Sequence, residues 1–438
     1  MISLFEYQKE HVDRLEKALL SYGVCKDSSD TGTGKTFTAC AVAERLAYSK
    51  VVVICPKAVI PAWKKTFALT KYSDEEVFVV NYELIKTGNH ALLHRRLKTF
   101  KWKCEPTTLI IFDEDHKVTG QYSLNARLLI QAVSQRFDIM LLGATTFTSP
   151  LQMNAIGYAL GLHQGYKQFA NWLLHVGCYK DIWNAWQAPK NNQEVLEKLN
   201  KYIFPARGSR MSVDDIPDFP ENNIIVESYH VEEPAKLSKI YADIHRVHDE
   251  LIAKQAEDGD SLLTEILRQR QNIELAKIPS VVDLIVSDLR SGKRVAVFVN
   301  FRDTLELIGE RMRRSVPNFS VIHGEQSVTE RQQNIEDFQN NSSPLIISTI
   351  GAGGVGISLH DLSKDGMYPR SSIILPSFSA VELRQALGRI HRSGSKSKST
   401  QRIVFASDTI EQQVCKRLSI KLNAFDTIND TDLNPFSV

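Results

Sequence analysis

The strongest constraint on the fold is a repeated alternation between short apolar runs, rich in β-branched residues, and helical stretches of mixed polarity. The apolar runs of the first part of the chain are 51–56, 77–82, 108–115 and 138–146. Those of the last part are 294–300, 319–324, 344–349, 372–376 and 401–407. Runs this apolar are typical of parallel strands that helices cover on both faces. The sequence therefore predicts an α/β fold with two doubly wound lobes.

Changes in this pattern set the expected domain boundaries. We expect a first lobe over 1–230, with a helical, aromatic-rich insertion at about 151–213. A helical bridge or protrusion over 231–280 follows, and a second lobe over 281–438 ends in a C-terminal helix. The Pro-rich stretch 214–223 is a plausible linker on the hinge side.

The aromatic segment 163–204 has two interpretations. Its large rings are Tyr166, Trp172, Trp183 and Trp186. They could stack on bases or sense a DNA junction, but aromatic side chains also dominate buried area, so the core of a helical insertion is favoured.

Composition excludes several settings. With 53 basic and 51 acidic residues the formal net charge is +2, so any site for a polyanion must be local. The six cysteines are scattered without a C-x-x-C pair, which favours a reducing compartment and no structural zinc. The N-terminus has acid and lysine where a secretory leader needs an apolar run, and no segment approaches ~18 apolar residues. We expect a cytoplasmic protein, in a bacterial host or a phage-infected cell, without a membrane span.

The stretch 29–36, SDTGTGKT, ends like a phosphate-binding loop, G-x-x-x-x-G-K-[ST], although Ser29 stands where the first glycine is usual. It lies between a weak strand signal and a helical pattern, an order that points backbone N–H groups of a helix N-terminus at phosphate oxygens. We expect Lys35 to reach the β and γ phosphates and the Thr36 hydroxyl to coordinate Mg²⁺. A chance match is the alternative, because the incomplete pattern is weak by itself. The expected nucleotide contacts of the loop are Gly32, Thr33, Gly34, Lys35 and Thr36.

An acidic turn, DEDH, ends the apolar run 108–115. A strand that delivers two adjacent carboxylates to a sheet edge can place one on a metal ion and the next beside the attacking water. Asp113 is the expected Mg²⁺ ligand and Glu114 the expected base. The alternative is an ordinary acidic turn, which an upstream G-K-T makes less attractive.

A second glycine-rich stretch, 351–356, fits the dinucleotide fingerprint G-x-G-x-x-G after an apolar run. That fingerprint also needs an acid about 20 residues further on, and the next run instead leads into Pro376 and Ser377. We therefore interpret these glycines, including Gly356, as backbone nests for phosphate.

An arginine-bearing helix is expected after residue 378. Ser379 and Glu382 form a capping-box pattern, and the apolar residues that follow share one helical face. Gln385, Arg389 and Arg392 fall on the opposite face. They are either a solvated basic face or nucleotide contacts that include an arginine finger, presented across a cleft to the γ-phosphate held by the first lobe.

With these motifs in this order, the chain resembles the superfamily 2 helicases and translocases of the Swi/Snf-type branch. The resemblance covers nearly the whole chain. In the first lobe it rests on LFEYQKEHV, DTGTGKT, VVVICPKAVIPAWKKTF, VVNYELI, DEDH and LLGATTFTSP. In the second lobe it rests on RVAVFVNFRDTLELI, VIHGEQSVTERQQNIEDFQ, LIISTIGAGGVGISL and RQALGRIHRSG.

The resemblance implies two RecA-like lobes that use ATP and Mg²⁺, with Gln8 on the adenine. It assigns hydrolysis to Asp113 and Glu114 and γ-phosphate contacts to Arg389 and Arg392. It also implies that residues 143–145 couple ATP hydrolysis to movement along the nucleic acid. Shortened loops of the form G-x-G-K-T occur in this superfamily, so the serine at position 29 is tolerable and ATP binding is expected.

Three positions depart from the family pattern. Asp115 stands where alanine or glycine is usual, GATTFTSP lacks the usual proline after the threonine, and HRSGS has serine where glutamine is usual. They bear on fine mechanism and leave the ATPase assignment in place. RQRQNIELAKIPSVVDLI, together with ESYHVEE, is similar to the fork-remodelling or annealing-helicase subgroup.

The function expected from this resemblance is a monomeric, ATP-driven motor on duplex or branched DNA, acting in branch migration or fork remodelling. An RNA helicase and a nucleotide-switched binding module without translocation are the alternatives. The expected DNA contacts, at strand ends that face the cleft, are Lys57, Asn300, Arg302 and Thr349.

Overall fold

The computed structural model describes residues 2–96, 99–119, 123–144, 149–165, 168–181, 184–217, 219–253, 259–353, 357–377, 379–420 and 433. The chain divides into two compact units, Met1–Pro217 and Asp218–Val438. Each unit contains a six-stranded sheet whose neighbouring strands are all parallel. The predicted α/β class with two parallel-sheet lobes is confirmed.

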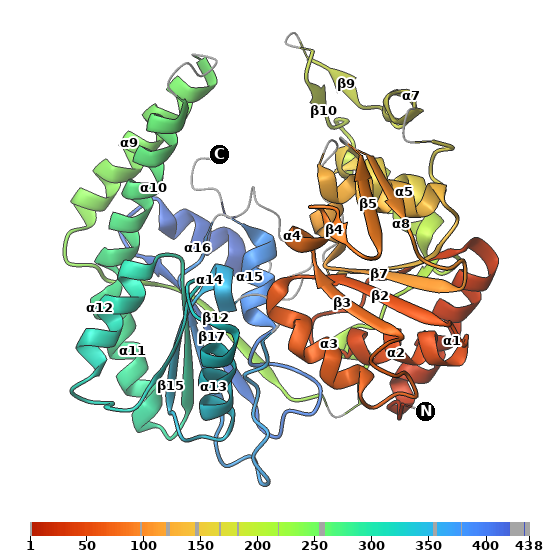
Figure 1. The fold of residues 1–438 in the computed structure, drawn as a ribbon. Helices are drawn as coiled ribbons and strands as arrows, with labels where there is room; N and C mark the ends of the chain where they lie inside the picture. Colours follow the sequence, from red (N-terminus) through yellow and green to blue (C-terminus); the bar gives the residue numbers. More distant parts are fainter. Residues whose placement is uncertain are drawn as a thin grey trace. The chain divides into compact units, whose positions relative to one another are not determined.

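The first unit is built on a sheet in the order β11-β1-β8-β7-β2-β3. Figure 1 labels its strands β7, β2 and β3. Its strands are β1 (Val24–Asp27), β2 (Lys50–Cys55), β3 (Val77–Asn81), β7 (Thr108–Asp113), β8 (Asp138–Leu142) and β11 (Gly208–Ser209). Its helices are α1 (Glu6–Tyr22), α2 (Lys35–Arg45), α3 (Ile60–Phe67), α4 (Tyr82–Ile85), α5 (Leu124–Ser134), α6 (Asn154–Ala159), α7 (Phe169–His175) and α8 (Asn192–Ile203). The central strands β2, β7 and β8 contain continuous apolar runs because helices cover both faces, and residues 51–55 of β2 are fully buried.

The first unit contains two further parts besides this parallel sheet and its helices. A three-stranded antiparallel sheet, which the sequence did not indicate, consists of β4 (Asn89–His90), β5 (Leu93–Arg96) and β6 (Thr99–Trp102). The aromatic insertion contains α7, α8 and the short hairpin of β9 (Tyr179–Lys180) and β10 (Trp186–Gln187). Trp172 and Trp186 are partly buried against the main core, which supports the core interpretation; Tyr166 and Trp183 lie outside the described residues.

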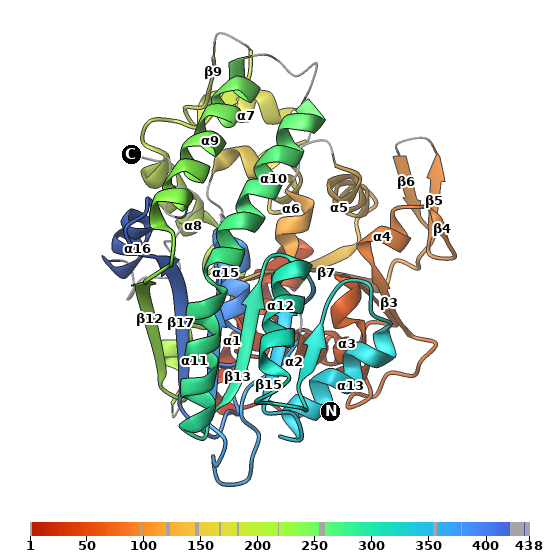
Figure 2. The same ribbon diagram turned by 90° about the vertical axis from the view of Figure 1, so that its left-hand side faces the viewer.

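The second unit has a sheet in the order β12-β17-β16-β13-β15-β14. Figure 2 labels its strands β12, β17, β13 and β15. Its strands are β12 (Asn222–Tyr229), β13 (Arg294–Val299), β14 (Ser320–Ile322), β15 (Leu345–Thr349), β16 (Arg370–Ile374) and β17 (Ser399–Ala406). Its helices are α9 (Pro234–Ala253), α10 (Gly259–Ala276), α11 (Ile278–Arg290), α12 (Arg302–Met312), α13 (Val328–Gln339), α14 (Ile350–Gly353), α15 (Ala380–Leu387) and α16 (Glu411–Ile420). All the apolar runs of the second half form strands here.

The segment between the lobes belongs to the second unit in the structure. Strand β12 pairs along its full length with β17, so the division falls at 217/218, whereas the sequence analysis placed the end of the first lobe at residue 230. The polar stretch that follows forms α9 and α10, which pack against each other as a long pair. Lys277, after α10, donates to both carboxylate oxygens of Glu411 on α16, which ties this pair to the second unit. Among the described helices, none has the length and apolar character needed to cross a membrane.

Candidate functional site

The phosphate loop connects β1 to α2, as the sequence predicts. Gly34 has a φ of 97°, a left-handed conformation that favours glycine, and is the N-cap of α2. Lys35 Nζ donates to the carbonyl oxygens of Ser29 (2.7 Å) and Asp30 (3.0 Å). The lysine therefore lies over the loop's own backbone, where phosphate oxygens would compete for the same ammonium group.

Ser29, the residue that replaces a glycine, is an anchor of the loop. It is fully buried, and its hydroxyl oxygen accepts from the backbone N–H of Met211 at 3.0 Å. Its own backbone N–H donates to Asp27 Oδ1 at 2.9 Å. The serine thus fixes the start of the loop to the end of β1 and to the segment after β11, two contacts that glycine could supply only in part.

A buried histidine and aspartate lie beneath the loop. His11 Nε2 is 3.0 Å from Asp27 Oδ2, and its Nδ1 is 2.9 Å from Ser209 Oγ. Burial by itself would raise the pKa of Asp27, but the neighbouring His11, the charge of Lys35 and the hydrogen bond from Ser29 together outweigh burial and lower this pKa to about 2. Asp27 is consequently ionised at neutral pH, and it also accepts a hydrogen bond from Thr38 on α2.

Gln8, the expected adenine contact, also bonds to the loop. Its Nε2 donates to the carbonyl of Thr33 at 3.0 Å, and its Oε1 accepts from the backbone N–H of Phe5 at 3.1 Å. A Cβ at Gly34 would lie 2.4 Å from Gln8 Nε2, so α1 and the loop are in close contact. The Thr33 hydroxyl is directed to Asp30 O at 2.9 Å, and Asp30 in turn receives bonds from Arg210 and the backbone of Val213.

The acidic turn ends β7 in the same unit. Asp113 Oδ2 accepts from the indole N–H of Trp63 at 2.8 Å, and Tyr82 donates its hydroxyl proton to the Asp113 carbonyl at 2.8 Å. Glu114 has a φ of 57°, a left-handed conformation that is uncommon without glycine. Its Oε2 lies 3.4 Å from His116 Nδ1.

Charges of the loop and of the turn influence each other. Burial lowers the pKa of Lys35, and the carboxylates of Asp27, Glu114 and Asp113 act in the opposite direction. Burial, followed by the charge of Glu114, raises the pKa of Asp113. A cation at this carboxylate would favour its ionised form, and hard oxygen donors suit Mg²⁺.

Asp115, one of the departures from the family pattern, forms a buried ion pair with Lys26 of β1. Both side chains are about 1 % exposed. A Cβ at Gly143, after β8, would lie 2.1 Å from Asp115 Oδ1. The charge of Asp115, unusual at this position of the family pattern, is thus neutralised by Lys26, a lysine buried inside the sheet. Thr145, of the coupling motif, lies outside the described residues.

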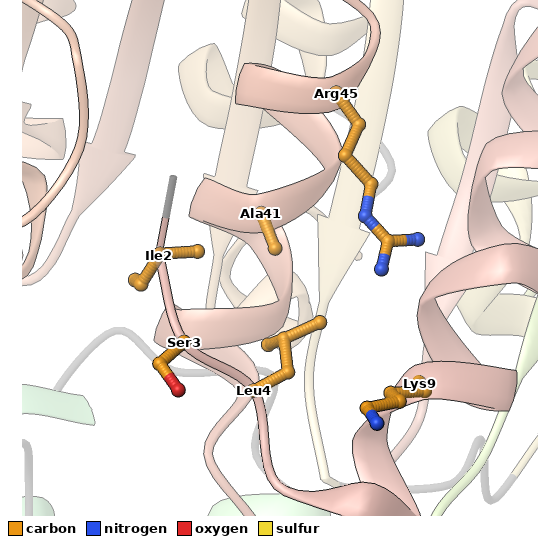
Figure 3. A pocket seen from close by; sticks show the side chains of 6 residues that line it. All are labelled: Ile2, Ser3, Leu4, Lys9, Ala41 and Arg45. Atoms are coloured by element: carbon orange, nitrogen blue, oxygen red, sulfur yellow. The ribbon is translucent and has the colours of Figure 1, made fainter.

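A pocket of about 310 Å³ lies between the N-terminal segment, α1 and α2 (Figure 3). Lys9 and Arg45 line it from the two helices, together with Ile2, Ser3, Leu4 and Ala41. Arg45 pairs with Asp13 and Glu16. Because the pocket contains none of the loop or acidic-turn residues, we place the phosphate site by the geometry of the loop.

In the second unit, Ser379 caps α15 as predicted, accepting from the N–H of Glu382. The Glu382 carboxylate bonds to Ser377 instead of closing the capping box. The prediction of one continuous helix is wrong, because α15 ends at Leu387, so Arg389 and Arg392 lie beyond it. Gln385 is 7 % exposed, which contradicts the solvated-face alternative for this residue, and its expected nucleotide contact stays a prediction.

Both predicted arginines bond within their own unit. Arg389 is 2 % exposed, and its guanidinium donates to the carbonyls of Gln385 (2.6 Å) and Ile357 (3.2 Å). Arg392 is half-buried and donates to Gly388 O (2.9 Å) and Ser358 Oγ (2.8 Å). They tie this motif to the segment that follows the glycine-rich stretch; Gly356 itself lies outside the described residues, and residues 351 and 353 belong to α14.

The four predicted DNA contacts have different surroundings. Lys57 is exposed after β2 in the first unit. In the second unit Asn300 directly follows β13, and Thr349 is the last residue of β15, which pairs with β13. The side-chain amide of Asn300 already donates hydrogen bonds within the unit, to the Glu274 carboxylate and to Leu375 O. Arg302 is exposed at the start of α12 and pairs with Glu306 and Glu325.

Sequence reasoning missed the residues that support the loop and the turn. They are His11, Lys26, Trp63, Tyr82 and Ser209. Glu274, which was also missed, bonds to Asn300 in the second unit. Two had a readable signal: His11 shares a helical face with Gln8, and Lys26 is a lone charge inside a predicted strand while Asp115 is an unexplained acid. The others depend on partners that are distant in sequence.

Two family descriptions match the chain. Residues 1–148 match "Type III restriction enzyme, res subunit", and residues 276–394 match "Helicase conserved C-terminal domain".

Curated relatives include two viral proteins and a plant protein. "Putative ATP-dependent RNA helicase L364" of Acanthamoeba polyphaga mimivirus is 32% identical over 98% of this chain and 84% of its own length. "Putative ATP-dependent RNA helicase QP509L" of African swine fever virus (isolate Tick/South Africa/Pretoriuskop Pr4/1996) is 24% identical over 93% of this chain and 69% of its own. "CHD3-type chromatin-remodeling factor CHR7" of Arabidopsis thaliana is 23% identical over 80% of this chain and 29% of its own. A solved structure, "Sulfolobus solfataricus SWI2/SNF2 ATPase core in complex with dsDNA", is 18% identical, with a TM-score of 0.40 over 98% of this chain and 94% of its own.

Proposed function

We propose that this chain, which belongs to the superfamily 2 helicases, is an ATP-driven motor that moves along duplex DNA and remodels forks or four-way junctions. The observation that carries the proposal is the convergence of the phosphate loop and the acidic turn in one unit. The loop follows β1 and Asp113 ends β7, and β8 lies between these two strands and is parallel to both, so the loop and the turn lie at the same edge of the sheet. The carboxylates of Glu114 and Asp113 partly offset the lowering of the Lys35 pKa by burial. Loop, cation and paired carboxylates are the parts that phosphoanhydride hydrolysis needs.

The residues of the first unit divide the chemistry as follows. Lys35 exchanges the loop carbonyls for phosphate oxygens, and the N-terminal amides of α2 bind the same oxygens. Glu114, held in its left-handed conformation beside Asp113, takes a proton from the attacking water. Asp113 and Thr36 would hold Mg²⁺, which supplies charge neutralisation at the phosphates when bound.

We assign the γ-phosphate contact of the second unit to Arg392 in preference to Arg389. Arg389 is almost fully buried and bonds to two backbone carbonyls of its own unit, so its release would leave buried acceptors unsatisfied. Arg392 is half-buried, so its guanidinium is closer to solvent than that of Arg389, and its bonds include those to Gly388 O and Ser358 Oγ. Its guanidinium exchanges these bonds for phosphate oxygens at lower cost.

Remodelling of branched DNA is favoured over processive unwinding on energetic grounds. Each base pair broken ahead of a migrating junction is matched by one formed behind it, so stacking of ~1.4 kcal/mol per step nearly cancels. A two-lobed motor then only has to bias the direction. The second candidate is an RNA helicase, because the mimivirus and African swine fever virus relatives carry that name.

The test is the ATPase rate without polymer and with duplex DNA, single-stranded DNA or RNA, for the wild type and three variants. Lys35→Ala, Glu114→Gln and Arg392→Ala should each lower kcat by ~10³-fold or more, the range of a lost base or arginine finger. Glu114→Gln should still bind a fluorescent ATP analogue, which separates lost chemistry from lost binding. A soluble Arg392→Ala variant with near-normal turnover would reject the assignment of that arginine.

The same preparation distinguishes the substrates. Conversion of four-way junctions and homologous forks is compared with displacement of a strand from a long partial duplex. Rapid displacement without junction activity would leave a conventional helicase, and stimulation by RNA alone would favour the second candidate.

A further inference from the structure

Residues 84–104 concentrate positive charge that the helicase motifs do not use. The stretch contains six Lys or Arg, two His and no Asp or Glu, in a chain whose formal net charge is only +2. The cationic residues are Lys86, Arg95, Arg96, Lys98, Lys101 and Lys103. A local excess of this size needs a structural or a functional reason.

The inner face of the β4–β6 sheet has a structural role. Leu93, Phe100 and Trp102 are 1–3 % exposed and belong to the core of the first unit. The Trp102 indole N–H donates to the carbonyl of Leu128 on α5 at 3.3 Å, and its backbone N–H donates to Gln135 Oε1 at 3.1 Å. These contacts anchor β5 and β6 on α5 and hold the sheet in a fixed position.

The outer face of the same two strands is basic and exposed. His94 and Lys101 are exposed and lie directly opposite each other in the antiparallel register, and Lys103 is exposed just beyond β6. Within the described part of the chain neither lysine forms a salt bridge, whereas Lys198 on α8 pairs with Glu194. We call the antiparallel pair β5 and β6, with Lys103 beyond it, the β5–β6 ribbon. Packing explains the apolar residues on its inner face but not the positive charge on its outer face.

The ribbon begins at the edge of the main sheet where ligands bind in α/β folds. It follows β3, which ends at Asn81 beside the parallel strand β2. Lys57 follows β2 at the same edge, and Asp113 ends β7, the next parallel strand. The carboxyl ends of parallel strands form the binding edge of such sheets.

We propose that the outer face of the β5–β6 ribbon, through Lys101 and Lys103, binds the phosphate backbone of duplex DNA; this inference rests on the proposed function. Lysines on a fixed surface gain affinity for DNA by releasing its counterions. Duplex is favoured over single-stranded DNA because the aromatic rings of the ribbon, Phe100 and Trp102, face the core. Among the described residues of the outer face there is no Phe, Tyr or Trp ring for the base stacking that single-strand binding uses.

The test measures the affinity for a blunt DNA duplex as a function of salt for Lys101→Ala/Lys103→Ala and the wild type. Loss of two phosphate contacts should reduce the log–log slope by about 1.8 and lower the affinity at 0.1 M salt by about 10- to 100-fold. ATPase turnover without polymer should stay unchanged, because both side chains are exposed and neither takes part in the contacts described for the phosphate loop or the acidic turn. The matched control, Lys71→Ala/Lys198→Ala, removes the same charge from exposed positions elsewhere in the unit and should leave the slope unchanged.

The outcomes separate this inference from the proposed function. If the wild type is stimulated by duplex DNA while the ribbon variant keeps its slope and affinity, the ribbon inference is overturned and the motor remains. If the wild type shows no binding to duplex DNA, both fail. A ribbon-dependent slope seen only with single strands or RNA would reject the duplex DNA assignment.

Discussion

The buried ion pair between Lys26 and Asp115 allows a quantitative test of the first unit. Both side chains are about 1 % exposed, so neither charge is solvated when its partner is removed. Breaking such a pair by truncating one member costs about 3–5 kcal/mol, while replacing both by apolar groups is often neutral. We therefore expect Lys26→Met and Asp115→Ala each to lower the free energy of unfolding by about 3–5 kcal/mol. The double variant should lose no more than about 2 kcal/mol, a coupling energy of several kcal/mol.

The assay is urea unfolding followed by tryptophan fluorescence. All five tryptophans of the chain lie between residues 63 and 186, so the signal reports the first unit alone. Alanine fits at position 115 because its side chain is smaller than that of aspartate and needs no additional room beside Gly143. If either single variant costs less than about 1 kcal/mol, or if the two costs simply add in the double variant, the ion pair does not stabilise this unit as argued.

Two further predictions concern the supports of the site. Trp63→Phe keeps an aromatic ring but removes the N–H donor to Asp113, and should raise the Mg²⁺ concentration for half-maximal ATPase by about 10- to 100-fold; an unchanged requirement would contradict this role. The pKa of Asp27 is lowered from 3.8 to about 2, so its pairing stabilises the fold by about 2 kcal/mol above pH 4 and loses this effect as the pH falls toward 2. The deficit in unfolding free energy of His11→Leu should therefore shrink between pH 4 and pH 2, and a deficit independent of pH would refute the electrostatic explanation.

Much of the candidate site was predictable because its signals are local. A buried parallel strand needs a continuous apolar run, so the runs at 51–56 and 108–115 indicated β2 and β7 without tertiary information. The loop before Lys35 and the turn at Asp113 follow such strands directly. The helix of the arginine motif was predicted too long, because Gly388 and the residues after it leave the helical path to bond with the segment at 357–358.

By itself, the sequence determined the two α/β lobes, the loop, the acidic turn and the family, since each depends on neighbouring residues or on motif order. The tertiary structure alone decided the partners of these motifs. Lys26 forms an ion pair with Asp115, 89 positions away in sequence, and the Ser29 hydroxyl accepts a hydrogen bond from the backbone of Met211, 182 positions away. Parallel strands bring their ends to one edge from anywhere in the chain, and burial then demands that each charge or polar group placed there has a partner. That requirement, which no local pattern encodes, turned an apparent anomaly at Asp115 into an ion pair and a missing glycine at Ser29 into an anchor of the phosphate loop.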